Sequence, residues 1–291
     1  MKFKLMKNLF LGLFCCISIQ VFSQNIDTNI VDFDGNRFFH LSYENNSKLL
    51  VFLHGGVSNP YFNQAKENIK LRFLVENNKD FVTHALIDGY DLLVPVSNSK
   101  LNWVADPEYC FKALDKFLTQ NSKKYKETVL SGFSDGGTGS FKIFYKHSDY
   151  FTGVIVFNGY PYHKNFADSL DYSTVNNKKV LFVGTKFDKT TPYEFMLTEY
   201  CKQKAFNPDT YIYVTNGEHE FHDYDGVEMK IIFSMLDTKP DNTETNAIHG
   251  YMRNDSLQQF YMFRKEIVRK YGFGEQFYEL NKTQKDSIKA K

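Results

Sequence analysis

The chain has 291 residues, enough to bury a sizeable core in one α/β domain. Its 35 lysines and arginines balance 34 aspartates and glutamates, which excludes a polyelectrolyte, and nothing in the sequence points to a nucleic-acid partner. The 29 phenylalanines and 19 tyrosines are expected mainly to fill the core.

The first 24 residues predict a secretory signal peptide. Three lysines precede an apolar stretch over residues 9–22, and polar residues follow it. This stretch is shorter than the roughly 20 residues of a permanent membrane span. We therefore expect cleavage of residues 1–24 and a protein that is exported, periplasmic or extracellular, with no stable membrane span left.

An antiparallel hairpin is predicted next, from residues 30–33 and 37–43 with a short polar turn between them. Residues 49–53 are apolar without interruption and predict a buried strand.

That strand ends in His54, Gly55 and Gly56. Two glycines let the backbone approach a ligand closely and leave amide hydrogens pointing into the space above a sheet. We expect such amides, together with the amide of Asp135, to form an oxyanion hole. The alternative is a plain tight turn after a strand.

Residues 61–77 predict a helix, residues 90–96 a strand and residues 107–118 an amphipathic helix. Trp103 is the only tryptophan and lies in the connection after that strand. It is a candidate for substrate contact, and a structural role is equally compatible with its position.

The pattern Gly-x-Ser-x-Gly spans residues 132–136 with Ser134 at its centre. It lies where the strand-like segment 128–131 gives way to the helix-like segment 137–147. In that context it predicts a nucleophile elbow, a strained turn that exposes the serine hydroxyl. The pattern alone is weak, and an ordinary glycine-rich turn is the alternative.

Residues 153–158 predict a further strand, and only 21 residues, 159–179, connect it to the next one. A large cap domain is therefore not expected. Tyr160 is a candidate substrate-binding residue, since it lies where the rim of an open site would be.

Two more strands end in candidate catalytic residues. The strand that begins at residue 180 leads to Asp188, and the strand that begins at residue 211 leads to His219. Imidazole can take the serine proton and return it, and a carboxylate can fix the tautomer of the ring. With Ser134, the order Ser, Asp, His is the one associated with α/β hydrolases.

His222 follows His219 by three residues and is the alternative general base. His219 is favoured because it comes directly after the last strand and its turn. Both histidines have carboxylate neighbours, but their spacing differs from the His-Glu-x-x-His of metalloproteases, so no metal site is expected.

On these residues the chain resembles the α/β-hydrolase superfamily, and within it the serine esterases related to feruloyl esterases and polyhydroxyalkanoate depolymerases. The resemblance covers residues 45–236. It implies a mostly parallel central sheet flanked by helices, with Ser134 as nucleophile, His219 as general base and acid, and Asp188 as the orienting acid. It also implies no metal or organic cofactor.

The expected domains are the signal peptide, a catalytic domain over residues 25–236, and a linker with a C-terminal helical extension over residues 237–291. After cleavage only Cys110 and Cys201 remain, and two separate buried thiols on helices are favoured over a bridge. The sequence leaves the oligomeric state open.

The expected function is that of an exported serine hydrolase, most simply an esterase that cleaves a small-molecule or polymer-linked ester through an acyl-enzyme. A serine peptidase of the same fold is the alternative. A noncatalytic binding protein is a third possibility, disfavoured because every triad residue is present.

Overall fold

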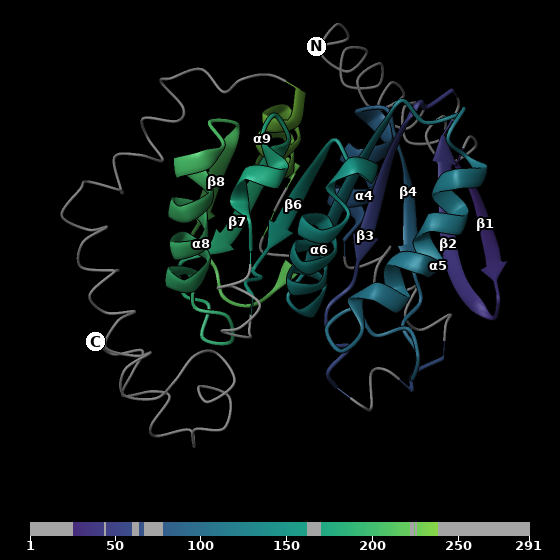
Figure 1. The fold of residues 1–291 in the computed structure, drawn as a ribbon, viewed down its shortest axis with the longest axis horizontal. Coiled ribbons are helices and arrows are strands. Elements are labelled where there is room, and N and C mark those ends of the chain that lie inside the picture. Colours follow the sequence, from purple (N-terminus) through teal and green to yellow (C-terminus); the bar gives the residue numbers. More distant parts are fainter. Residues whose placement is uncertain are drawn as a thin grey trace, which may run out of the picture.

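The computed structural model describes residues 26–43, 45–59, 64–66, 78–161, 170–221, 224 and 226–237. Within them lies one eight-stranded sheet with the strand order β1-β2-β4-β3-β5-β6-β7-β8 (Figure 1). β1 (Ile26–Phe33) and β4 (Tyr90–Pro95) pair antiparallel with β2 (Asn36–Tyr43). All other pairs are parallel, among β3 (Lys48–Leu53), β4, β5 (Glu127–Phe133), β6 (Gly153–Phe157), β7 (Lys179–Thr185) and β8 (Thr210–Thr215). The predicted mostly parallel sheet is confirmed.

Helices cover both faces of this sheet (Figure 1). One face carries α5 (Pro107–Gln120), α6 (Asp135–Lys146) and α8 (Tyr193–Phe206). The other carries α4 (Lys79–Ile87) and α9 (Gly226–Asp237), which contact each other. The short 3-10 helices η1 (Ser148–Tyr150) and η2 (Tyr172–Val175) lie in connections.

The central strands are mostly apolar because both of their faces are buried. In β3, Leu49, Val51 and Leu53 belong to the core under α5, α6 and α8, whereas Leu50 and Phe52 belong to the core under α4 and α9. This alternation explains why residues 49–53 lack the polar alternation of a half-exposed strand.

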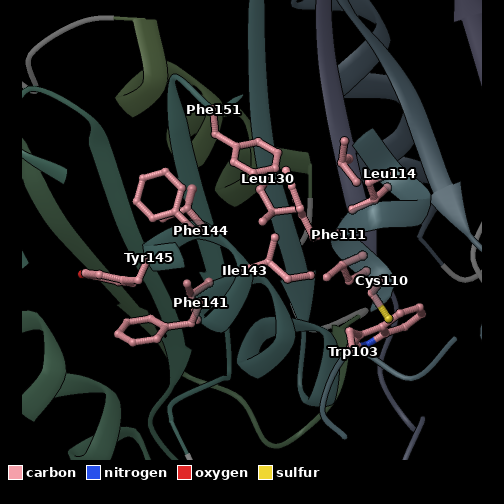
Figure 2. Close-up of a cluster of buried hydrophobic side chains, with 14 of the residues drawn as sticks. Trp103, Cys110, Phe111, Leu114, Leu130, Phe141, Ile143, Phe144, Tyr145 and Phe151 are labelled. Atoms are coloured by element: carbon pink, nitrogen blue, oxygen red, sulfur yellow. The ribbon is translucent and has the colours of Figure 1, made fainter. Parts of the chain in front are cut away.

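Aromatic side chains fill the larger core, as expected from the composition. Figure 2 shows Phe141, Phe144 and Tyr145 of α6 together with Phe151 and Leu130. Burying each large apolar side chain contributes about 2–3 kcal/mol relative to leaving it exposed.

The opening hairpin is confirmed, and its first strand begins four residues earlier than predicted, at Ile26 rather than residue 30. Asp34 and Gly35 form the two-residue turn with φ values of 54° and 77°. Positive φ at both central positions is what a type I′ turn requires, and its twist matches that of the flanking strands.

Several predictions need correction or lie outside the described residues. Helix α4 was not predicted, although its buried residues Phe81, Val82, Ala85 and Leu86 repeat with a helical period. The helix predicted over residues 61–77 lies outside the described residues, apart from three positions. So do the signal peptide, most of the linker and the C-terminal helices.

The described residues contain two cysteines, Cys110 on α5 and Cys201 on α8, and both thiols are free. Cys110 is buried as predicted, but Cys201 is only half-buried. No helix in the described part of the chain has the length and hydrophobicity needed to cross a bilayer.

Candidate active site

Ser134 lies on the turn that joins β5 to α6, as the sequence predicts. Its φ of 57° and ψ of −119° place it in a region that residues with a side chain rarely adopt. The neighbouring strand β6 holds this turn in place, because the Ser134 amide donates to the carbonyl of Phe157, the last residue of β6, at 3.0 Å.

The glycines of the elbow are required by close backbone approach. A Cβ on Gly136 would lie 1.7 Å from the carbonyl oxygen of Leu53, and a Cβ on Gly132 would lie 2.3 Å from that of Gly136. No side chain fits at such distances, so α6 can begin directly above the end of β3 only with glycine at both positions.

The structure brings the three predicted triad residues together. His219 Nε2 is 2.8 Å from Ser134 Oγ, and His219 Nδ1 is 2.7 Å from Asp188 Oδ2. Asp188 follows β7 and His219 follows β8, so the three side chains come from the carboxyl ends of three parallel strands. The imidazole keeps 20% of its surface exposed, whereas the Asp188 side chain is fully buried.

Five hydrogen bonds converge on the Asp188 carboxylate. Oδ1 accepts from the amides of Thr190 and Thr191, both at 2.7 Å. Oδ2 accepts from Thr191 Oγ1 at 2.6 Å, Asn158 Nδ2 at 2.6 Å and His219. Burial would raise the pKa of Asp188, but the His219 interaction and the Thr191 hydrogen bonds outweigh it and hold the pKa below its usual 3.8.

The protonation pattern follows from this ionised carboxylate. A carboxylate can only accept, so His219 Nδ1 carries the ring proton and donates it to Asp188. Nε2 is then left to accept the hydrogen bond from the Ser134 hydroxyl. This is the arrangement in which an imidazole can remove the serine proton.

The predicted oxyanion turn lies against the elbow. A Cβ on Gly55 would be 3.1 Å from the Cβ of Ser134, and Gly56 has a φ of 75°. Asp135 begins α6, and its Oδ2 accepts from the Ser58 amide at 2.9 Å. The structure therefore brings Gly55, Gly56 and Asp135 to the same place beside Ser134.

His54 orients this turn. Its Nε2 accepts from the Ser97 amide at 3.3 Å, so the ring proton lies on Nδ1, which donates to the Gly55 carbonyl at 2.8 Å. The Gly55 carbonyl and the Gly56 amide share one planar peptide and point in opposite directions. Holding the carbonyl thus also fixes the direction of the Gly56 N–H.

Trp103 and Tyr160 do not have the positions expected of substrate-binding residues. Trp103 is fully buried, and its ring packs against Gly139 of α6 and edge-on to His54 at 4.7 Å. Tyr160 is buried as well, stacks on Phe195 at 4.9 Å and does not line an open rim. For both residues the structure supports a role in packing.

Two neighbours of His219 were missed by the sequence reasoning. The Thr191 hydroxyl bonds Asp188 and lies 3.2 Å from His219 Nδ1. The Phe133 ring packs on the imidazole with centroids 5.0 Å apart. The sequence could have indicated Phe133, because it is the variable residue next to Ser134 in the elbow pattern. Nothing in the sequence singled out Thr191.

The described residues contain no group of three or more His, Cys, Asp or Glu side chains that could hold a metal ion. His222, the alternative base, lies outside the described residues.

The fold is similar to that of several solved hydrolases at low sequence identity. The esterase Pf2001 of Pyrococcus furiosus aligns with a TM-score of 0.55 and 16% identity, over 75% of this chain and 94% of that one. Est1E from Butyrivibrio proteoclasticus aligns with a TM-score of 0.51 and 13% identity, over 72% of this chain and 95% of that one.

An acylaminoacyl peptidase of Pyrococcus horikoshii is also similar, with a TM-score of 0.52 and 14% identity. The match covers 73% of this chain but only 41% of the peptidase. No protein-family model and no curated protein matches the sequence.

Proposed function

We propose, from the α/β-hydrolase fold of this chain, that it is an exported serine hydrolase that cleaves a carboxylic ester through an acyl-enzyme. The observation that carries the proposal is the continuous hydrogen-bonded series Asp188, His219, Ser134 on a strained elbow. Export rests on the N-terminal sequence.

In the acylation step, Ser134 Oγ attacks the ester carbonyl carbon while His219 Nε2 takes the hydroxyl proton. The carbonyl electrons move onto the oxygen, and the new imidazolium is stabilised by the ionised Asp188. When the C–O bond to the alcohol breaks, His219 returns the proton to the leaving alkoxide. The acyl group is then esterified to Ser134.

Deacylation repeats the sequence with water in place of serine. His219 removes a proton from water, the resulting hydroxide attacks the acyl carbon, and Ser134 leaves with the proton that His219 returns. The amides of Asp135 and Gly56 are the proposed donors to the oxyanion in both steps. Each such donor stabilises the transition state by about 3–4 kcal/mol in comparable sites.

An ester substrate, small or polymer-linked, is preferred over a peptide because the Pf2001 esterase is matched over 94% of its length, whereas the peptidase is matched over only 41% of its length. The predicted absence of a large cap suits a substrate that reaches the triad from solvent. A serine peptidase is the second candidate, favoured by the peptidase neighbour.

Labelling with a fluorophosphonate, located by mass spectrometry, tests the proposed nucleophile. We expect modification of Ser134 alone, no modification of Ser134→Ala, and wild-type labelling in Ser122→Ala, which changes an exposed serine far from the elbow. A folded wild-type protein that stays unlabelled would contradict the proposal. Aryl esters compared with peptide anilides then decide between the esterase and the peptidase.

A further inference from the structure

Asn158 occupies a particular place in the sheet. It directly follows β6, the strand that lies between the nucleophile strand β5 and the acid strand β7. Asn158 is buried, with only 2% of its surface exposed. Its φ of 44° is left-handed, a conformation that asparagine tolerates better than most residues. Its backbone amide donates to the carbonyl of Val183 in β7 at 2.8 Å.

The side-chain amide of Asn158 contacts both loops that carry the triad. Nδ2 donates to Asp188 Oδ2 at 2.6 Å and to Thr185 Oγ1 at 2.7 Å. Thr185 in turn donates its hydroxyl proton to the carbonyl of Glu218, the residue before His219. One side chain therefore connects to the acid directly and to the loop of the base through a single hydroxyl.

Tyr224 fixes which way this amide faces. Its hydroxyl donates to Asn158 Oδ1. A flipped amide would turn Oδ1 toward the Asp188 carboxylate, where two acceptors would repel, and would turn the NH₂ group toward Tyr224. The series Tyr224, Asn158, Asp188 thus has one favourable direction of donation.

We propose that Asn158, oriented by Tyr224, is the positioning residue that holds the acid and base loops in register with Ser134. The inference rests on the proposed hydrolase function. Asn158 does not touch the reacting atoms, and it acts through Asp188 and through the backbone before His219.

Asn158→Gly tests the role directly, because glycine accepts the left-handed backbone and the change removes the side-chain amide together with its methylene. We expect kcat to fall about 10- to 100-fold with KM unchanged, as for other groups that orient a reacting side chain by hydrogen bonding. Asn177→Gly is the matched control, since Asn177 has a φ of 65° and is exposed in the turn before β7. That control should keep the wild-type kcat.

Asn158→Asp adds a readout that simple loosening of the fold would not move. A second carboxylate against Asp188 raises the pKa of the pair, so the acid limb of the kcat/KM profile should move up by about one pH unit or more. Among the described residues, the other titratable groups that face this pair are His219, Glu194 at the start of α8, and Tyr224, whose hydroxyl bonds Asn158. An unmoved acid limb would contradict the assignment.

Tyr224→Phe removes only the hydroxyl that orients the amide. We expect a smaller fall in kcat than for Asn158→Gly, and no further fall when the two changes are combined, because Tyr224 acts through Asn158. Additive effects would show that Tyr224 acts elsewhere. A kcat of Asn158→Gly within twofold of wild type, or a loss confined to KM, would overturn the proposal.

The downfield proton NMR signal of His219 Nδ1–H keeps this inference separate from the hydrolase proposal. The signal should be present in the wild type and in Asn177→Gly, and shifted or lost in Asn158→Gly. If the wild type hydrolyses no ester and binds no probe, the proposed function fails, while this signal still decides the role of Asn158. An unchanged signal in Asn158→Gly would refute it.

Discussion

At the scale of single residues, Ser134, the proposed nucleophile, has a strained backbone. A residue with a Cβ at φ 57° and ψ −119° is held there only because its surroundings over-determine the turn. Gly55 lies beside the serine, where an added Cβ would come within 3.1 Å of the Ser134 Cβ, and the Ser134 amide donates to the Phe157 carbonyl. The strain is compatible with a hydroxyl that must project from the turn toward His219.

Comparison of Ser134→Gly with Ser134→Ala measures that strain. Both variants lose the nucleophile, so both should be inactive. Glycine avoids about 1–3 kcal/mol of backbone strain in the folded protein. Its greater conformational freedom in the unfolded chain offsets part of this gain in stability. We expect Ser134→Gly to be more stable than Ser134→Ala by about 1 kcal/mol in urea denaturation. Equal stabilities would mean that the elbow stores no strain.

At the scale of elements, the site depends on how closely α6 approaches the end of β3. Gly136→Ala would force a Cβ to within 1.7 Å of the Leu53 carbonyl, so α6 would have to move away from the sheet. We expect a loss of about 3 kcal/mol in the free energy of unfolding or more, together with loss of Ser134 labelling. Chemical denaturation and the labelling rate measure the two effects.

Gly226→Ala is the control for this prediction. Among the described residues, the nearest atom outside the local backbone to a Cβ on Gly226, at the start of α9, is 3.8 Å away, so the variant should stay close to wild type. A Gly136→Ala protein as stable as Gly226→Ala would contradict the close packing.

The element scale also shows what a sequence can and cannot predict. β7 was predicted from its apolar run, β8 from its alternating character and β5 from a strand-like segment before the Gly-x-Ser-x-Gly pattern. The residues that follow these strands were recognisable as polar groups at strand ends. The same signal was present at Asn158, which ends an apolar strand, but an asparagine suggests no reaction on its own. Its role depends on a contact with Asp188 across 30 residues of chain.

Exposure was the property that the sequence did not determine. Trp103 and Tyr160 lie in connections on the same edge as the triad, which suggested contact with substrate. Their rings are buried because Gly139 leaves room for the indole and Phe195 stacks on the phenol. Such pairings join distant parts of the chain, and no local pattern encodes them.

At the scale of the whole molecule, a buried carboxylate and its polar and charged partners lie at the end of the sheet opposite the triad. Asp91, near the start of β4, accepts from Lys124 at 2.6 Å, Tyr125 at 2.8 Å and the Tyr43 amide at 3.2 Å, with His40 3.7 Å away. Burial would raise the pKa of Asp91, but these partners outweigh it and lower the pKa below its usual 3.8.

This depressed pKa predicts a pH dependence of stability. The unfolded chain binds the proton more readily than the folded protein, so the contribution of Asp91 is complete above the usual pKa and is lost as the pH falls below 3.8. We expect Asp91→Asn to lower the free energy of unfolding by about 2 kcal/mol at pH 7, and the difference from wild type to shrink toward pH 3.

Denaturation curves across this pH range measure the effect. Asp149→Asn, at an exposed carboxylate of η1, is the control and should track the wild type throughout. A deficit of Asp91→Asn that stays constant down to pH 3 would show that it does not arise from the ionised carboxylate.

The packing of Trp103 gives the protein an optical reporter. The chain has one tryptophan, and its indole lies edge-on to the same imidazole that holds the Gly55 carbonyl. When the protein is excited at wavelengths that its 19 tyrosines do not absorb, emission therefore comes from a single fluorophore, one contact away from the turn proposed to bind the oxyanion. Movement of that turn can be followed by fluorescence without attaching a dye or altering a residue.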